Sequence, residues 1–471
     1  MKTVANSLAE LVSDIQFNKL SDEVVKETKR RVLDALGCAF GGFDGEPSVI
    51  MRNVAADLGG KPESTVLGAS YRTSCEKAAL VNSTMLRYLD YMDSHAGADA
   101  CHPCFNIPPC LAVAERVNAS GKDLIAAIVA GYEIQIRFQE ACKIGPRGWF
   151  SGTYLEFSVP LAAGKLLGLD VERLKNALAI AATHANALSV NSGSIPGSKS
   201  VADGMVALTG VLGALMADAG LTGPTDIIDS AGVFEKAVAG RIDVERLLKP
   251  TFEYQVMEVN TKWFNTVRTA QTAVTSMFSL LEKHRLGWRD VEAITVFLPT
   301  KEHIGHDGIW NSTSRLRPQN RDTANHSLVY SLAVAMVDGE LGPEQYADAK
   351  LRDPDVLSVI DRTTLQADAS LDRHWPEAAV SRVVLRTKNG QSCEATTLYP
   401  PGHHKNRVTD RQIQQKFAKL TSQVLGQEKQ AAIIETVGRL EELASVKELT
   451  TYLRGEQTVA RRKAGANYSS S

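Results

Sequence analysis

Apolar residues recur at helical spacing in one segment after another between residues 20 and 221. Ser21 followed by Asp22 and Glu23 is typical of a helix start, and the apolar stripe that follows ends before Gly37. Residues 161–169 and 205–219 are apolar on nearly all sides, which indicates helices buried on most faces. The further helices expected here cover residues 161–169, 171–190 after a cap at Asp170, and 205–219. The pattern therefore predicts a large all-helical domain.

The spacing of apolar residues changes in the second half of the chain. Residues 291–298 mix β-branched and apolar side chains, which predicts a strand. Two similar runs, 383–387 and 393–399, flank Asn389-Gly390, the strongest short signal for a hairpin. Helical segments are expected at 277–281 and 328–337. This mixture predicts an α+β domain over residues 261–400.

Helices return after Pro400. Thr409 and Gln412 have the spacing of a capping box ahead of an amphipathic run, and residues 433–453 are again helical in pattern. We expect this last segment to pack on the first helical domain. The predicted architecture is mainly α, with a helical domain over 1–260 completed by 401–455, an inserted α+β domain over 261–400, and a flexible tail over 456–471.

The composition adds limits on partners and location. The chain has 471 residues, and 52 Lys and Arg oppose 54 Asp and Glu, which gives a net charge of −2. This balance provides no global field for gripping nucleic acid. The first residues lack the apolar core of a signal peptide, and the longest uncharged stretches fall short of the ~20 residues of a membrane span. We therefore expect a cytoplasmic protein without nucleic-acid or membrane partners, whose seven scattered cysteines are reduced thiols.

The most unusual local chemistry lies between Arg87 and Cys110. Asp90 and Asp93 are three apart at the end of a helical pattern, which predicts that both lie on one helix face. Loops held by a rigid scaffold often carry catalytic groups, and a solvated polar loop is the alternative. Three carboxylates and two imidazoles fall within thirteen residues: Asp90, Asp93, His95, Asp99 and His102.

Two patterns resemble ligand sites without fitting them. A lone Cys-x2-Cys without a second pair is weak evidence for zinc or an iron–sulfur cluster, so we expect no metal site. The run before Lys199 resembles a phosphate loop, but its spacing differs. A P-loop has four residues between its glycines and no residue between the second glycine and the lysine, whereas this run has three and one. ATP binding is therefore excluded. The residues concerned are Cys101, Cys104 and Cys110 with His95 and His102 nearby, and Gly193-Ser-Ile-Pro-Gly197-Ser-Lys199.

Several cations lie where a small anion would bind. Lys199 precedes an apolar helix, so its ammonium would meet an anion near the amino end of that helix. Lys262 stands where the helical domain gives way to the α+β domain, and domain junctions favour ligand clefts. Arg317, Arg321 and His326 precede a further helix. Solvated surface lysines and an ordinary capped helix start are the alternatives.

A set of motifs occurs in a fixed order along the chain. They are Asp34-x2-Gly37-Cys38, Leu89-Asp90-Tyr-Met-Asp93-Ser94, His102-Pro103-x2-Asn106, Lys165-Leu-Leu-Gly-Leu169, Gly220-Leu-Thr-Gly-Pro224, Gln271-Thr-Ala-Val274, Asn320-Arg-Asp-Thr-Ala-Asn-His-Ser327 and Gly402-His-His404-Lys405-Asn406. In this order they resemble the MmgE/PrpD family from about residue 6 to residue 440. The family includes 2-methylcitrate dehydratases, cis-aconitate decarboxylases and an iminodisuccinate epimerase. The resemblance implies a large helical domain holding both termini, an inserted α+β domain, a homodimer, and no metal or organic cofactor.

Within this family, the chain resembles the methylcitrate dehydratase branch. Asp90 and His102 are twelve residues apart with Asn106 four beyond, and residues 321–327 are similar to that branch's Arg-Glu-Thr-Ala-Asp-His-Ser. Three departures fall at positions that resemble pocket positions, so they leave the substrate open. They are Asn325 in place of Asp, Gly148-Trp149-Phe150 without a His-Pro, and Phe264-Asn-Thr-Val-Arg-Thr-Ala-Gln271 in place of Phe-Pro-Ala-Glu-Phe-His-x-Gln.

The resemblance implies a substrate with two or three carboxylates and, for this branch, its dehydration to an alkene in propionate catabolism. Removing a proton beside a carboxylate and expelling hydroxide without a metal needs a base, an acid and fixed cations. We hypothesise that Asp90 and His102 form the acid/base pair, with the carboxylate orienting the imidazole. The residues expected to hold the substrate are Ser94 by a hydrogen bond, Lys199, Lys262 and His326 as a cationic cradle, and Arg317 and Arg321 as its extension.

Other functions are compatible with the same cradle. A decarboxylase of the cis-aconitate type also develops charge next to a bound carboxylate, and an epimerase of an amino or imino dicarboxylate needs bases on two faces of one carbon. A non-catalytic relative that binds a tricarboxylate is a further alternative. The sequence alone leaves these alternatives open.

Overall fold

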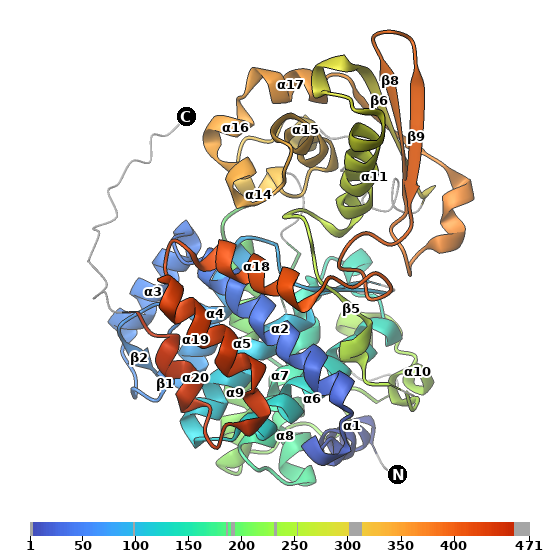
Figure 1. The fold of residues 1–471 in the computed structure, drawn as a ribbon. Coiled ribbons are helices and arrows are strands. Elements are labelled where there is room, and N and C mark those ends of the chain that lie inside the picture. Colours follow the sequence, from blue (N-terminus) through green and yellow to red (C-terminus); the bar gives the residue numbers. More distant parts are fainter. Residues whose placement is uncertain are drawn as a thin grey trace, which may run out of the picture.

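Two hydrophobic cores organise the molecule (Figure 1). The computed structural model describes residues 3–97, 99–184, 187–189, 194–229, 233–251, 253–300 and 313–455. One core gathers side chains from residues 4–259 and 408–453, and the other from residues 270–385. The predicted tail and Gly193 lie outside the described residues. The predicted helix 171–190 is too long, because the helix ends at Ala182 and residues 187–189 are not helical.

Helices build most of the larger core. They are α1 (Val4–Asp14), α2 (Asp22–Gly41), α3 (Glu46–Leu58), α4 (Cys75–Tyr88), α5 (Ile107–Val117), α6 (Gly121–Ala141), α7 (Leu155–Leu166), α8 (Val171–Ala182), α9 (Lys199–Asp218) and α10 (Val244–Leu248). Two small sheets accompany them. The first pairs β1 (Ser64–Thr65) with β2 (Arg72–Thr73), and the second has the order β4 (Ala100–Cys101), β3 (Ser94–Ala96) and β5 (Val259–Asn260).

The predicted helix starts are confirmed by their caps. The Oγ of Ser21 accepts a hydrogen bond from the Val24 amide (3.3 Å), and the Asp170 carboxylate accepts one from the Arg173 amide (2.9 Å). Side chains of this kind satisfy amides that the first helical turn leaves without partners. The helix after Ser21 continues past the end of its apolar stripe to Gly41. Gly37 inside it is a point of close approach, because a Cβ there would lie 3.2 Å from the Phe417 Cα.

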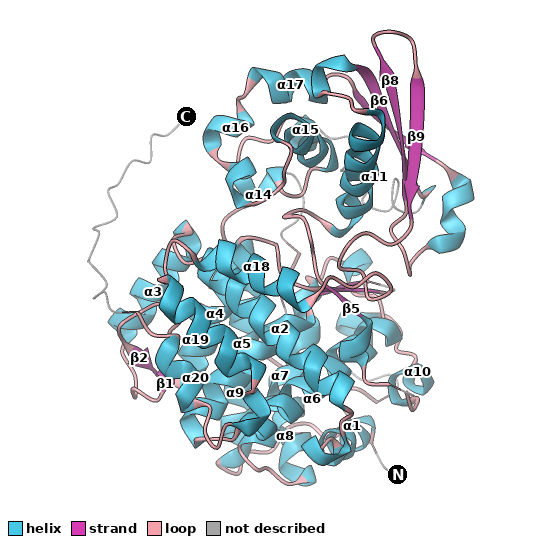
Figure 2. Cartoon of the chain, viewed as in Figure 1, coloured by secondary structure: helices cyan, strands magenta, loops and turns pink. Residues whose placement is uncertain are grey.

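A four-stranded sheet organises the smaller core. Its order is β7 (Thr363–Ala367), β6 (Val291–Leu298), β8 (Ser381–Thr387) and β9 (Ser392–Thr397), with β6 parallel to β7 and antiparallel to β8. β6 has the predicted bounds, and the predicted hairpin turns at Asn389-Gly390, where Gly390 has a φ of 84°. α11 (Arg268–His284) packs on β8, β9 and α15 (Leu328–Asp338) (Figure 2). The remaining helices of this domain are α13 (Thr313–Leu316), α14 (Arg321–Ala324), α16 (Asp348–Leu351) and α17 (Pro354–Ile360).

The chain then returns to the helical domain through α18 (Asp410–Thr421), α19 (Gln427–Gly438) and α20 (Lys447–Tyr452). Thr409 and Gln412 form the predicted capping box, with each side chain bonded to the other's amide. α18 lies across α2, so the last segment packs beside the first (Figure 1). The expected helical run 433–453 is interrupted after Gly438. A mainly α fold with an inserted α+β domain is confirmed, and the residue boundaries of the domains stay a prediction.

One helix within the described ranges is long and apolar enough to cross a membrane, judged by length and composition alone. This helix is α9, and 56% of its most apolar window is buried inside the structure. It packs against α4, α7 and α8. Counting uncharged residues from Met205 underestimated its length, because Lys199 and Asp203 also belong to the helix.

Candidate active site

Asp90 lies just beyond the end of α4 in an unusual backbone conformation. The helix ends at Tyr88, and Asp90 has a φ of 53°, which is in the left-handed region. Residues other than glycine rarely adopt this region, and holding one there costs on the order of 1–3 kcal/mol. Such conformations cluster at functional sites.

Asp93 points to a different part of the core. Its carboxylate accepts hydrogen bonds from the Tyr132 hydroxyl (2.8 Å) and the Cys104 amide (3.1 Å). The prediction that Asp90 and Asp93 share a helix face is therefore wrong, because α4 ends before both residues and the turn at Asp90 separates them.

Four basic side chains from separate segments meet at the Asp90 carboxylate. The Lys262 Nζ lies 3.0 Å from Oδ1 and 2.7 Å from the Asp90 carbonyl oxygen. The Arg87 Nη1 lies 3.2 Å from Oδ1, while the Lys199 Nζ and the His326 Nε2 lie 3.5 Å and 2.9 Å from Oδ2. We call these five residues the Asp90 cluster. Four of them were predicted as site residues from the sequence: Asp90, Lys199, Lys262 and His326.

The Asp90 cluster carries more positive than negative charge. Burial raises the pKa of Asp90, but Lys199, Lys262 and Arg87 outweigh burial and hold it well below its usual range, so this carboxylate is ionised. Arg87 also reaches Asp203, with 3.4 Å between Nε and Oδ2. Burial raises the pKa of Asp203 to about 6. Three cations thus face two carboxylates in a buried site, which favours binding of an anion.

Lys199 is the first residue of α9 and is 2% exposed. Burial and the nearby Arg87 lower its pKa to about 7, against the opposing effect of Asp90. A group with a pKa near the working pH is suited to general acid or base catalysis. Lys199 therefore offers proton transfer in addition to the anion-binding charge that we predicted.

His326 connects Lys199 with Asp90. Its Nδ1 lies 2.9 Å from the Asp322 carbonyl oxygen, which only accepts, so Nδ1 carries the ring hydrogen. Its Nε2 lies 2.8 Å from the Lys199 Nζ. Burial and Lys199 lower the pKa of His326 to about 3. The lowered pKa opposes the predicted cationic His326, while the Nε2 also lies 2.9 Å from the Asp90 Oδ2, a contact that favours the cation, so the charge of this ring stays a prediction.

His102 lies beside the cluster and is oriented by the backbone. Its Nδ1 is 2.7 Å from the Asp93 carbonyl oxygen, so Nδ1 donates and Nε2 keeps its lone pair. Burial, Arg87 and Lys262 lower the pKa of His102 well below its usual value, which makes the ring a neutral base. The prediction that Asp90 orients His102 is wrong, because the Asp90 carboxylate contacts His326 instead.

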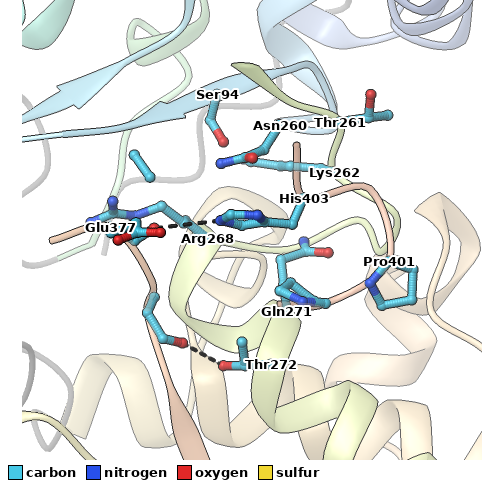
Figure 3. A pocket seen from close by; sticks show the side chains of 13 residues that line it. Ser94, Asn260, Thr261, Lys262, Arg268, Gln271, Thr272, Glu377, Pro401 and His403 are labelled. Carbon is cyan, nitrogen blue, oxygen red and sulfur yellow. Dashed lines mark hydrogen bonds between the residues drawn. The ribbon is translucent and has the colours of Figure 1, made fainter. Parts of the chain in front are cut away.

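The other predicted residues lie around the cluster or outside it. Ser94, in β3, lines a pocket together with Lys262 (Figure 3). Arg321 donates to the Tyr88 carbonyl (2.6 Å) and stacks on the Tyr88 ring, so it holds the end of α4. Arg317 is ion-paired with Asp361 and does not join the predicted cradle.

Three residues of the site were not assigned from the sequence: Arg87, Asp203 and Lys416. Arg87 is three residues before Asp90, and Asp203 is four residues after Lys199 on α9, so helical spacing was the available signal. Lys416 comes from α18, and its Nζ binds Asp34 (2.8 Å) and the carbonyl oxygens of Tyr91 (2.9 Å) and Lys262 (3.0 Å). Lys416 thereby fixes the two segments that carry Asp90 and Lys262.

The cysteines form part of the core. All seven are unpaired, and six of them are buried. Among the residues that the structure describes, no group of three or more His, Cys, Asp or Glu side chains is arranged to hold a metal ion. Cys104 bonds to Asp93 through its backbone amide.

Comparison with protein-family models covers most of the chain. Residues 6–246 match the MmgE/PrpD N-terminal domain, and residues 264–442 match the MmgE/PrpD C-terminal domain. The chain belongs to the MmgE/PrpD family. The resemblance deduced from the ordered motifs is therefore confirmed.

Curated members of the MmgE/PrpD family are similar to this chain over most of their length. A cis-aconitate decarboxylase-like protein of Aspergillus oryzae is 26% identical, with 96% of this chain and 98% of the relative covered. The cis-aconitate decarboxylase of Mus musculus is 24% identical, with 97% and 94% covered. The 2-methylcitrate dehydratase of Escherichia coli is 24% identical, with 85% and 86% covered. These relatives support an enzyme of the lyase type.

The three departures from the dehydratase pattern lie near the cluster. Asn325 is fully buried, and its Oδ1 contacts the His326 Nδ1. Phe150 lies under the Arg87 guanidinium, 5.6 Å from its central carbon to the ring centroid. In the third departure, the fully buried Asn265 donates its side-chain amide to the carbonyl oxygen of Leu89, the residue before Asp90. All three departures therefore bear on the shape and charge of the candidate site.

Proposed function

We propose that this protein is a hydro-lyase that dehydrates 2-methylcitrate or a related hydroxy tricarboxylate to the aconitate-type alkene. One observation carries the proposal: a neutral imidazole and a lysine with a pKa near 7 lie beside a buried surplus of cations. Dehydration needs a base, an acid and bound carboxylates together.

In the proposed reaction, the His102 Nε2 removes the proton from the carbon next to a substrate carboxylate. The electron pair of that C–H bond becomes the second bond of the alkene, and the C–O bond to the hydroxyl breaks. Lys199 gives its proton to the departing hydroxide, which leaves as water. The products are the alkene, water, an imidazolium at His102 and a neutral amine at Lys199, which exchange protons with solvent before the next turnover.

The remaining residues of the cluster hold charge in place. Lys262 and Arg87 bind substrate carboxylates and stabilise the negative charge that develops in the transition state. Asp90 is too strongly ionised to act as the acid, so we assign it as a positioning residue that fixes Lys199, Lys262 and His326. Ser94 donates its hydroxyl to the substrate from the adjoining pocket.

Decarboxylation of a cis-aconitate-type acid is the second candidate. The decarboxylase relatives align with 96–97% of this chain, against 85% for the methylcitrate dehydratases, and this wider match favours decarboxylation. In that reaction Lys199 would protonate the carbanion left by loss of carbon dioxide, and His102 would have no proton to remove.

We further propose that the protein acts as a homodimer. α9 presents an apolar stripe formed by Met205, Leu208, Leu212 and Met216, in which the two methionines are exposed (50% and 41%) and the two leucines are half-buried. These positions are three to four residues apart and therefore lie along one side of the helix. Partly exposed apolar stripes of this kind are typical of interfaces between subunits.

The test is a product analysis with purified protein offered 2-methylcitrate, citrate and cis-aconitate separately, with and without EDTA. Ultraviolet absorbance follows a new conjugated alkene, and NMR identifies the product. Formation of an alkene that retains all carboxylates, at the same rate with and without EDTA, supports the dehydratase. Release of carbon dioxide from cis-aconitate would replace the proposal with the decarboxylase. Solvent deuterium at one carbon with inverted configuration would indicate an epimerase, and binding without turnover a non-catalytic relative.

A further inference from the structure

A pocket lies where the helical domain meets the α+β domain (Figure 3). Ser94 lines it from the helical domain, Arg268 and Glu377 line it from the α+β domain, and Lys262 and His403 line it from the two segments that connect the domains. Lys262 belongs to both the pocket and the Asp90 cluster, since its Nζ binds the Asp90 carboxylate. The pocket therefore adjoins the reacting groups of the proposed site.

Arg268 is the first residue of α11, and its guanidinium lies over the Trp375 ring, 4.6 Å from the centroid. Its Nη1 is buried without a hydrogen-bond partner, and no carboxylate among the described residues is ion-paired with it. Two buried lysines near the junction are ion-paired instead: Lys262 meets Asp90, and Lys416 meets Asp34. Arg268 is only partly buried and lines the pocket, so its guanidinium is available to a ligand there.

The polar groups near Arg268 in the pocket are bound to other partners. The Glu377 carboxylate is ion-paired with Lys405 and accepts a hydrogen bond from the Tyr399 hydroxyl (3.1 Å). Burial lowers the pKa of His403, so this ring adds no charge at neutral pH. The Gln271 amide is occupied by the Phe264 and Thr266 carbonyls. Arg268 and Lys262 therefore make the pocket electropositive, with the Ser94 hydroxyl between the domains.

We propose that Arg268 determines substrate specificity by binding a carboxylate remote from the reacting carbons, so that the enzyme prefers tricarboxylates to dicarboxylates. This inference rests on the proposed function of the Asp90 cluster. A guanidinium forms two parallel hydrogen bonds with a carboxylate, which a lysine ammonium does not reproduce. The Asp90 cluster would hold the reacting end of the substrate, and Arg268 the far end.

Binding of unreactive acids tests the inference without any turnover. Tricarballylate has three carboxylates, and glutarate and 2-methylsuccinate are the same carbon chain with one carboxylate fewer. Calorimetric titration should show that Arg268→Gln weakens tricarballylate binding by about 10- to 100-fold. Glutarate lacks the central carboxylate of tricarballylate, and 2-methylsuccinate lacks a terminal one. Whichever of the two acids lacks the carboxylate that Arg268 holds should lose less than about threefold in affinity on the same substitution.

Two further variants keep the result interpretable. Arg268→Lys retains the charge without the paired donors and should recover only part of the affinity, which covers the case that Arg268→Gln folds poorly. Arg289→Gln removes an exposed arginine of the same domain, paired with Asp355, and should leave all affinities unchanged. In turnover, Arg268→Gln should raise KM for the tricarboxylate and leave kcat within about threefold.

The inference is overturned if tricarballylate binds Arg268→Gln as tightly as it binds the wild type, or if all three acids lose affinity equally. Neither result touches the proposed reaction, which the product analysis decides separately. Conversely, an Arg268-dependent preference for tricarballylate without alkene formation would retain the inference about binding and reject the dehydratase.

Discussion

Lys199 is the residue of the site whose charge changes near neutral pH. Burial lowers its pKa to about 7, and its Nζ lies 2.8 Å from the Nε2 of the adjacent His326. The ammonium can therefore give up its proton near neutral pH. A carboxylate of a bound substrate would add to the effect of Asp90 and raise this pKa.

The role of Lys199 as an acid predicts a particular pH dependence. Activity as kcat/KM should fall as the pH rises through about 7, because the free enzyme then loses the proton that the leaving hydroxide needs. In Lys199→Arg the descending limb should move to higher pH, because arginine stays protonated. Rate profiles over pH measure this, and an unchanged descending limb in Lys199→Arg would assign the limb to another group.

His102 allows a test of which ring nitrogen matters. The amide of Asn can replace the Nδ1 donor toward the Asp93 carbonyl, and the amide of Gln reaches the place of Nε2. Neither amide is a base, so both His102→Asn and His102→Gln should lose about 10²- to 10⁴-fold in kcat. The melting temperature of His102→Asn should stay near that of the wild type. If either variant keeps most of its rate, His102 is not the base.

At the scale of elements, α18 fixes the site from outside it. Lys416 neutralises the buried Asp34 and binds the carbonyls of Tyr91 and Lys262. Both segments of the site therefore depend on a helix that makes no contact with the Asp90 carboxylate itself.

Removing Lys416 should therefore destabilise the protein strongly. Lys416→Met leaves Asp34 as a buried charge without its partner, which costs about 3–5 kcal/mol of unfolding free energy in urea denaturation. Lys419→Met on the same helix is the matched control, because Lys419 is exposed and paired on the surface with Glu340. The control should change stability by less than about 0.5 kcal/mol. Equal midpoints for the two variants would contradict the structural role of Lys416.

Elements with strong local signals could be predicted from the sequence. Residues 291–298 are rich in β-branched and apolar side chains as a strand is, Asn389-Gly390 sets a hairpin, and Thr409 caps α18, all through neighbours in the chain. Lys416 could not be assigned in this way, because its partner Tyr91 is 325 residues away. The backbone turn at Asp90 likewise depends on Lys262 and Arg87 holding its carboxylate, and no local pattern specifies it.

The candidate site shows the same division. The ordered motifs contain Asp90 and His326, and Lys199 and Lys262 were predicted from their places before a helix and at the domain junction. The structure brings these four residues together. The predicted contacts between site residues were wrong where they depended on geometry, since the Asp90 carboxylate contacts His326 and not His102. Burial lowers the pKa of His326, and burial of a single side chain is a property of the whole fold.

At the scale of the whole molecule, the proposed homodimer predicts a change of mass on substitution. Met205→Glu together with Met216→Glu places two charges on the apolar stripe of α9 and should yield monomers, because burying unpaired carboxylates in an interface is costly. Light scattering after size-exclusion chromatography measures the mass. Val117→Glu, at the end of α5 and outside this stripe, is the control and should keep the wild-type mass. A wild-type protein that is already monomeric would reject the proposal.

The return of α18 to α2 also has a consequence for synthesis on the ribosome. When residue 260 has been made, the first helical domain still lacks Lys416, and about 150 further residues must be translated before it emerges. At 5–20 residues per second this takes roughly 8–30 s. During that interval the face of α2 around Gly37 is uncovered and Asp34 has no cation. The nascent chain thus exposes one apolar helix face for the whole time in which the α+β domain is translated, and that face is the expected binding site for a chaperone.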